Sequence, residues 1–227
     1  MRILRIAIIL VIAMSLSKAG FTQETNDKNS NSETLQGVAK TGSIKMTFTD
    51  ITYKGLKVEG SLKPNVTMTK YTLDFHGEGF ELSGEVLVKE LKRVLHLNYN
   101  GQEITGEIKH PALGIHNHPW NVNFLGSELK GAVSFNATYN KATFDVASEY
   151  YKIAGFIKDK DLSIDYGLTI NNKSINGVIK RKLIEKIEYN LELDHLIQEE
   201  FGLFLLIETI RLIEMDQMDN SLDQNDW

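Results

Sequence analysis

Apolar and polar residues alternate with a period of two over most of the chain between residues 42 and 172. One set of runs places apolar residues on either side of a central glycine: Leu56–Leu62, Phe80–Val88, Ile104–Ile108, Leu129–Phe135 and Ile153–Ile157. A second set consists of apolar–polar–apolar triplets: Met46–Phe48, Leu73–Phe75, Leu97–Tyr99, Val122–Phe124, Phe144–Val146 and Ile164–Tyr166. Strict alternation is typical of strands with one buried face and one face in solvent, which pair antiparallel. The pattern predicts about ten or eleven strands, joined as a meander of hairpins.

Short turn sequences separate several of these runs. They are Gly77–Gly79, Asn100–Gly101 and Leu125–Ser127. An Asn-Gly pair between two alternating runs is the strongest short-range hairpin signal, because both residues tolerate the positive φ angles of a tight turn. We therefore expect strands that are neighbours in the sequence to be neighbours in the sheet.

A glycine recurs at the middle of the apolar face in five runs, at Gly60, Gly84, Gly106, Gly131 and Gly155. A glycine inside a strand costs stability and marks a bend or a close approach by another element. If these glycines line up across neighbouring strands, they form a groove on the buried side and let a large sheet curl. Incidental bulges are the alternative interpretation.

Beyond Asn172 the spacing of the apolar residues changes. They fall four apart, and then three or four apart, at Ile175, Ile179, Leu183, Ile187, Leu191, Leu193, Ile197, Phe201, Phe204 and Leu205. This spacing predicts a helix over about residues 175–215, although residues 175–179 also resemble one more glycine-centred strand. Residues 201–213 are apolar nearly all round, so other elements must enclose them. The predicted fold class is α+β, with a large curled antiparallel β-meander wrapped around one long C-terminal α-helix.

The first 19 residues have the composition of a secretory signal peptide. Two arginines precede the apolar run Ile6–Leu16, and the small-residue exit Ser17–Ala19 follows it. The run is too short to cross a bilayer, which takes about 20 apolar residues. Cleavage after Ala19 would remove three positive charges and take the formal net charge from −5 to −8. We expect an exported protein, either extracellular or, in a bacterium, periplasmic.

Two further segments differ in composition from the rest. Residues 20–41 are rich in Asn, Ser, Lys, Glu and Thr, and we expect a disordered polar leader because such a segment buries too little apolar surface to offset its ordering entropy. Residues 216–227 are acidic and amide-rich, and we expect a flexible tail. The remaining residues, 42–215, are predicted to form a single domain, with the sheet over about 42–172.

Composition excludes several classes of protein. The chain of 227 residues has no cysteine, so it holds neither a disulfide scaffold nor a thiolate metal site. It has 25 Lys and Arg against 30 Asp and Glu, which disfavours a nucleic-acid partner because phosphate binding needs a basic face. The sequence identifies no protein partner.

Catalytic motifs are absent from the sequence. It contains no Gly-x-Ser-x-Gly elbow, no phosphate-binding loop and no His-Glu-x-x-His pair. Acidic residues are plentiful, but nothing marks out a catalytic pair among them. We therefore expect that the protein is not an enzyme and takes no cofactor.

The densest polar cluster contains His110, His116 and His118. Three imidazoles are enough to hold zinc together with a water molecule, so these residues are weak candidates for a metal site. Two prolines and a glycine place them in a loop, and no carboxylate lies close in sequence. The alternative interpretation is a loop that covers one end of the sheet.

Three sequons occur, at Asn65, Asn136 and Asn172. Each lies at an expected turn or strand end, where a glycan has room in solvent. These asparagines are candidates for glycosylation in a eukaryotic secretory pathway.

The chain resembles the takeout and juvenile-hormone-binding family of arthropods and the group seven mite allergens, which belong to the tubular lipid-binding superfamily. The residues that carry the resemblance are Phe48–Leu56, which end in Gly-Leu, then Tyr71–Phe75 leading to Phe80–Val86, and finally Ile175–Glu188, where that family enters its last helix. The chain departs from the family in lacking the N-terminal cysteine pair. The resemblance implies a carrier for an apolar ligand, without catalysis.

A ligand of that kind would lie in the seam between the sheet and the helix. The apolar residues expected to face the seam are Leu73, Phe75, Phe80, Leu82, Leu97, Tyr99, Phe124, Phe135, Phe201 and Phe204. Ordinary core packing uses the same residue types and is the alternative interpretation for each of them. The function predicted from the sequence is a secreted carrier of a hydrophobic small molecule or lipid. The alternative is a non-catalytic secreted or periplasmic interaction or structural protein with a closed core.

Overall fold

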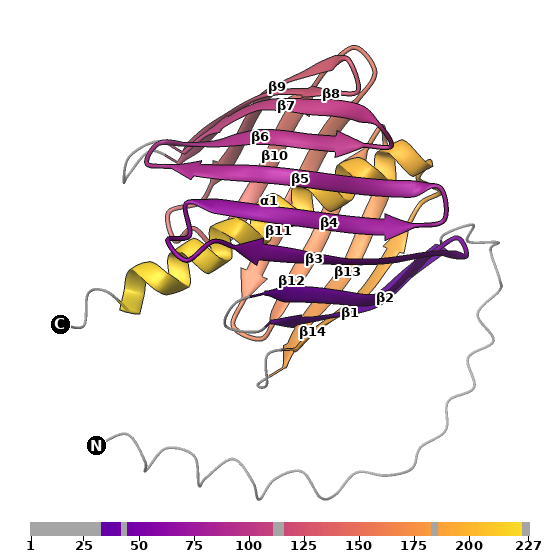
Figure 1. The fold of residues 1–227 in the computed structure, drawn as a ribbon, viewed down its shortest axis with the longest axis horizontal. Helices are drawn as coiled ribbons and strands as arrows, with labels where there is room; N and C mark the ends of the chain where they lie inside the picture. The colour runs from indigo at the N-terminus through magenta and orange to yellow at the C-terminus, as the bar shows by residue number, and fades with distance from the viewer. Residues whose placement is uncertain (1–32, 42–44, 111–115, 183–185, 224–227) are drawn as a thin grey trace, which may run out of the picture. The chain divides into compact units, whose positions relative to one another are not determined.

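The computed structural model describes residues 33–41, 45–110, 116–182 and 186–223. Its strands are β1 (Glu33–Thr41), β2 (Met46–Tyr53), β3 (Leu56–Pro64), β4 (Lys70–Gly77), β5 (Phe80–Lys89), β6 (Lys92–Tyr99), β7 (Gln102–Lys109), β8 (Asn117–Phe124), β9 (Ser127–Phe135), β10 (Lys141–Ala147), β11 (Lys152–Lys160), β12 (Ser163–Ile170), β13 (Lys173–Lys182) and β14 (Lys186–Leu193). They are followed by the helix α1 (Gln198–Asp223). Each strand pairs antiparallel with the next, and β1 also pairs with β14, so the sheet closes into a barrel (Figure 1).

The antiparallel pairing predicted from the alternation is confirmed, but the predicted fold class is wrong. The protein is a closed 14-stranded β-barrel with one C-terminal helix, whereas the sequence pattern predicted an α+β fold with a curled sheet around a long helix. Closure follows from β1 and β14, which the pattern did not reveal, and from β13, for which the pattern left a strand open as the alternative to a helix. Together these three strands join the two ends of the meander. A closed barrel leaves no edge strand with unpaired backbone groups.

The helix begins at Gln198 and not near residue 175. Residues 173–182 and 186–193 form the strands β13 and β14 instead. The error has a simple physical origin, because residues four apart share a face both on a strand, where the period is 2, and approximately on a helix, where it is 3.6. In β14 the buried side chains are Ile187, Tyr189, Leu191 and Leu193, which alternate as a strand requires.

The boundaries of the predicted polar segments also change. Residues 33–41, which composition placed in the disordered leader, form β1, and its Leu35 and Ala39 are buried in the barrel. Helix α1 continues through residues 216–223, which were expected to belong to a flexible tail. The predicted signal peptide, residues 1–19, lies outside the described residues.

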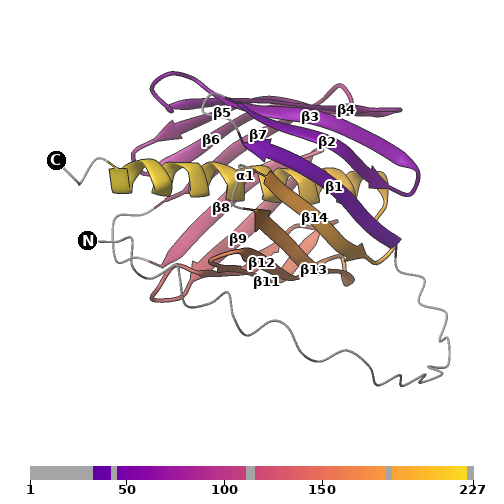
Figure 2. The ribbon, with the colours of Figure 1, turned by 90° about the horizontal axis from the view of Figure 1, so that it is seen from below.

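Helix α1 runs through the inside of the barrel (Figure 2). All residues from 200 to 213 are buried except Arg211, so this segment is enclosed on every side, as its all-round apolar composition predicts. Glu200 sets the start of the helix. It accepts a hydrogen bond from the backbone N–H of Ile197 at 2.9 Å, which is the return half of a capping box, and it forms an ion pair with Lys173 on β13 at 2.7 Å. Among the described residues, no helix combines the length and the hydropathy that crossing a membrane requires.

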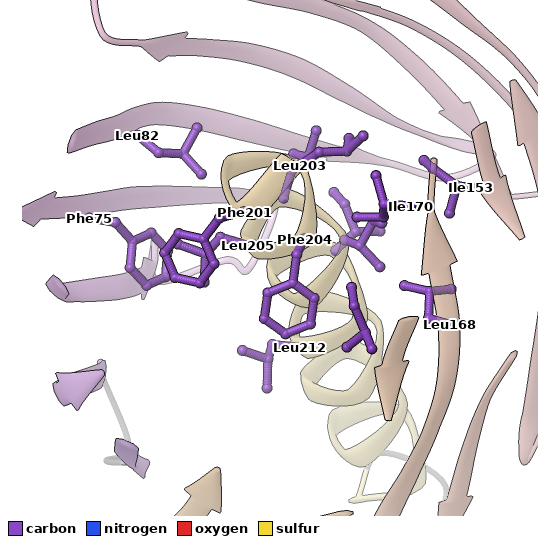
Figure 3. Packing of buried hydrophobic residues seen from close by; sticks show 14 of the residues in the cluster. Phe75, Leu82, Ile153, Leu168, Ile170, Phe201, Leu203, Phe204, Leu205 and Leu212 are labelled. Carbon is purple, nitrogen blue, oxygen red and sulfur yellow. The ribbon is translucent and has the colours of Figure 1, made fainter. Parts of the chain in front are cut away.

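The first half of α1 fills its part of the barrel with apolar side chains. Phe201 lies toward Phe75 and Leu82 on one wall, and Ile153 and Ile170 approach the helix from the other wall (Figure 3). A small space beside Phe75 is too narrow to admit a water molecule. At this end the barrel is therefore a packed core.

Four of the strand glycines have positive φ angles and let the neighbouring strand approach closely. Gly84, Gly106, Gly131 and Gly155 have φ angles between +106° and +145°, a region that residues with a side chain rarely adopt. A Cβ atom at any of these four positions would lie 2.1–2.4 Å from a carbonyl oxygen of the next strand. The glycines therefore allow the close approach, and the backbone of a neighbouring strand takes the space of the groove that the sequence suggested.

Candidate functional site

A cavity of about 650 Å³ lies between the second half of α1 and the wall formed by β7 to β13. Its lining residues are Ile108, His118, Trp120, Val133, Phe135, Tyr139, Asn140, Ala142, Phe144, Ile157, Lys158, Asp159, Lys160, Asp161, Ile164, Arg181, Ile207, Ile210, Arg211, Glu214 and Met215. We call it the barrel cavity. Its volume is within the range of small-molecule sites, which is about 300–1,000 Å³.

The cavity exists because polar contacts hold the second half of the helix against the opposite wall of the barrel. Arg93 on β6 binds Glu214 through two hydrogen bonds, of 2.8 and 3.1 Å. Tyr71 on β4 donates a hydrogen bond of 2.5 Å to Asp216. The side-chain amide of Gln217 donates one of 2.9 Å to the backbone carbonyl of Met68. These contacts all come from the β3–β6 side, so the gap opens toward β7–β13.

The two sides of the barrel cavity differ in character. The residues from β7 to β10 are mostly apolar and include Trp120, Val133, Phe135 and Phe144. The residues from the ends of β11 and β13, and from the turn after β11, are charged: Lys158, Asp159, Lys160, Asp161 and Arg181. The cavity can therefore accommodate a molecule with an apolar part and a polar part.

A buried ion pair lies beside the barrel cavity on its charged side. Arg211 donates to both carboxylate oxygens of Glu208, at 2.7 Å from Nε and 2.6 Å from Nη2. The hydroxyls of Tyr166 and Tyr189 also donate to Glu208, the second at 2.8 Å. Burial raises the pKa of both phenols well above their usual value, so both remain hydrogen-bond donors.

The Glu208 carboxylate determines the charge state of Arg211. Burial by itself would lower the pKa of the guanidinium, but the nearby carboxylate more than offsets this effect, and the pKa lies well above its usual value. The four hydrogen bonds to Glu208 occupy both of its oxygens. Among the described residues, Arg211 Nη1 has in contrast only a weak contact with the sulfur of Met215, at 4.0 Å. This guanidinium keeps unused donors where it lines the barrel cavity.

The predicted histidine cluster is only partly brought together. His110 and His118 face each other, with 3.2 Å between their Nδ1 atoms, and His118 also packs on Phe135. His116 packs instead on Tyr139. No group of three or more potential metal ligands occurs among the described residues, which exclude 111–115 of the connecting loop. Of the three histidines, His118 is the one that lines the barrel cavity.

We expect His118 to make the folded protein less stable in mild acid. Burial, assisted by the charges of His110 and Arg93, lowers the pKa of His118 to about 4. The unfolded chain, with a histidine pKa of about 6.5, then binds more protons than the folded chain between about pH 4 and 6.5. Stability contributed by His118 is fully present above pH 6.5 and is lost as the pH falls, by about 2 kcal/mol at pH 5. Urea unfolding at pH 7.5 and pH 5 measures this change.

Two variants test the assignment to His118. His118→Gln removes the titrating group, so the free energy of unfolding of this variant should fall less between the two pH values. His76→Gln removes a histidine whose side chain is 62% exposed and should leave the pH dependence as in the wild type. Equal pH dependence in the wild type and in His118→Gln would contradict the prediction.

Most of the predicted seam residues lie in the packed core and not around the barrel cavity. Phe135 lines the cavity. The other nine are buried and are not among its lining residues: Leu73, Phe75, Phe80, Leu82, Leu97, Tyr99, Phe124, Phe201 and Phe204. They fill the half of the barrel that the first turns of α1 occupy.

Sequence reasoning missed the charged side of the barrel cavity. The helix predicted over residues 175–215 includes Arg181, but this residue lies near the end of β13 and donates to Asp159 on β11 at 2.5 Å. Glu208 and Arg211 interrupt the apolar segment 201–213, and this interruption was the sequence signal of a buried ion pair. A charge inside an enclosed apolar helix needs a buried partner, and the spacing of three residues makes the two side chains partners for each other.

The three sequons lie in exposed turns, as the sequence predicted. Asn65 and Asn136 occupy matching turns, in which the side-chain amide donates to the Thr two residues later at 3.0 Å. Asn172 is in the tight turn between β12 and β13. All three side chains are exposed, so each can be reached by a modifying enzyme.

No protein-family model, curated protein or solved structure matches this chain. The resemblance to the takeout and mite-allergen family therefore stays a prediction.

Proposed function

We propose that the protein is a secreted, non-catalytic carrier that binds a hydrophobic small molecule or lipid in the barrel cavity. The observation that carries this proposal is the cavity itself, a space of about 650 Å³ inside an otherwise packed barrel. A closed barrel with an apolar interior is compatible with a binding protein. Secretion rests on the signal-peptide pattern of residues 1–19, which precede the described residues.

The lining of the barrel cavity supports an apolar ligand. Trp120 and Phe144 are buried, lie edge to face with ring centres 6.3 Å apart, and form part of the wall opposite α1. Ile207 and Ile210 face them from the helix. Each methylene group that a ligand buries against such a surface contributes about 0.8 kcal/mol, so a chain of several carbons gains useful affinity from this wall.

Native mass spectrometry of protein exported from eukaryotic cells tests the proposal. We expect a discrete adduct of small mass that organic extraction removes. Ala142 lines the barrel cavity, and Ala142→Trp should abolish the adduct because the larger side chain occupies the ligand space. The mass of the polypeptide in the same spectrum reports whether residues 1–19 have been removed.

The matched control is Ala137→Trp. Ala137 is exposed in the turn between β9 and β10, so the same substitution there adds a tryptophan without filling the cavity. This variant should keep the adduct. If the wild type carries no adduct and takes up no apolar compound that is offered, the carrier function is wrong, and the alternative of an interaction protein with a closed core is favoured.

A further inference from the structure

Arg181 lines the barrel cavity and has more hydrogen-bond donors than acceptors. A guanidinium carries five N–H donors, and the described residues supply one carboxylate oxygen, from Asp159 to Nη2 at 2.5 Å. Its Nε is shielded from solvent and meets no acceptor within the described part of the chain, although the side chain as a whole is 26% exposed. An unpaired buried donor costs about 1–3 kcal/mol, so a ligand atom that accepts from this guanidinium removes that cost.

Arg211 presents a second incomplete guanidinium to the same cavity. Its Nε and Nη2 donate to Glu208, whereas the one contact that the described residues offer Nη1 is a sulfur atom. The side chain is 14% exposed, so its unused donors lie where little water competes for them. Two arginines with spare donors thus line one cavity, one from β13 and one from α1.

The charged groups around the cavity are largely paired with one another. The unused hydrogen-bond donors therefore determine whether the cavity favours an anionic or a cationic ligand. Arg181 is matched by Asp159 and Arg211 by Glu208. The carboxylate of Glu214, which also lines the cavity, is held by Arg93. The other carboxylate of the lining, Asp161, is exposed to solvent in the turn after β11. A cationic ligand held away from that turn would have to break one of these pairs to find a carboxylate. An anionic ligand needs only the donors that are still available.

We infer that the ligand of the barrel cavity is an amphiphile with a carboxylate, whose oxygens accept hydrogen bonds from Arg181 and Arg211 while its apolar chain lies against the wall of Trp120 and Phe144. This inference rests on the proposed function. The guanidinium favours a carboxylate over a neutral acceptor because it binds carboxylate oxygens in a planar, charge-assisted fork. The charged β11–β13 side of the cavity and the apolar β7–β10 side match the two parts of such a molecule.

Trp120 supplies the signal for the test. The chain has two tryptophans, and Trp227→Phe leaves Trp120, which lines the cavity, as the sole emitter. In this background, dodecanoate, dodecanol and dodecylammonium are titrated and the three dissociation constants compared. We expect dodecanoate to bind about tenfold more tightly than dodecanol, which corresponds to about one additional charge-assisted hydrogen bond. Dodecylammonium should bind most weakly.

Arg181→Gln tests the role of the guanidinium. It should bring the affinities for dodecanoate and dodecanol to within about threefold of each other, with the dodecanol affinity unchanged. Lys180→Gln is the matched control, because it removes a positive charge from the adjacent, exposed position of β13 and should leave the preference intact. Arg211 is left unchanged, because its removal would strand the buried Glu208.

The outcomes separate this inference from the proposed function. Equal affinity for dodecanoate and dodecanol, or tighter binding of dodecylammonium, overturns the carboxylate inference and leaves the carrier function standing. An unchanged preference in Arg181→Gln overturns the assignment to Arg181. If none of the three compounds binds, both the inference and the carrier function fail.

Discussion

Glu208→Leu is expected to lower the free energy of unfolding by about 3–5 kcal/mol, because it leaves a positive charge uncompensated inside the barrel. Arg211 would lose both oxygens of its partner, and the hydroxyls of Tyr166 and Tyr189 would lose their acceptor. Each buried polar group without a partner costs about 1–3 kcal/mol, so the phenols add to the penalty. Urea unfolding monitored by circular dichroism measures the change at pH 7.5.

A double variant separates the charge from the loss of packing. In Glu208→Leu with Arg211→Met, the stranded charge is gone, and more than half of the lost stability should return, since replacing a buried ion pair with apolar residues is often close to neutral. Glu103→Leu, at an exposed position of β7, should change stability by less than about 0.5 kcal/mol. A loss below about 1 kcal/mol in Glu208→Leu, or a double variant as unstable as the single one, would contradict the assigned role of this pair.

Gly106→Ala should destabilise the barrel by about 3 kcal/mol, because the alanine would strain the backbone and its Cβ atom would collide with the neighbouring strand. The φ angle of Gly106 is +140°, and a Cβ atom there would lie 2.3 Å from the carbonyl oxygen of Asn121 and 2.7 Å from the Cα of Val122. These atoms belong to the backbone of β8, which cannot move without breaking its pairing with β7. The free energy of unfolding again measures the effect.

Gly101→Ala is the control that isolates strain from overlap. Gly101 also has a positive φ angle, +83°, but a Cβ atom there would meet nothing within 4 Å. Alanine at this turn should therefore cost about 1 kcal/mol, from backbone strain alone. If both substitutions cost the same, the close approach of β7 and β8 does not explain why glycine is needed at position 106.

The sequence was most informative where a local period has one structural meaning. The alternation in residues such as Ile104–Ile108 predicts a strand, and the Asn100–Gly101 turn predicts a hairpin between β6 and β7, which the register confirms. The all-round apolar composition of residues 201–213 predicts an enclosed helix without showing which elements enclose it, and these residues are buried except Arg211. The sequence failed at Ile175–Leu191, because a spacing of four residues fits both a strand and a helix.

Long-range pairing explains the other missed strand. In β1, small or polar residues fill much of the buried face, and Gly37 packs against Ile51 of β2, where a side chain would collide. Taken alone, such a segment buries too little apolar surface to order itself. Its order comes from hydrogen bonding to β2 on one side and β14 on the other, and β14 is about 150 residues away in sequence.

The sequence by itself determined the antiparallel hairpins, the positions of the strand glycines and the enclosed helix, because each depends on residues within a few positions of one another. Only the tertiary structure decided that the barrel closes, that Glu208 meets Tyr166 and Tyr189, and that Arg181 and Arg211 line one cavity. These contacts join residues on different strands and on the helix. Their geometry depends on the closed wall and on the contacts, such as Arg93 with Glu214, that hold the helix to one side of it.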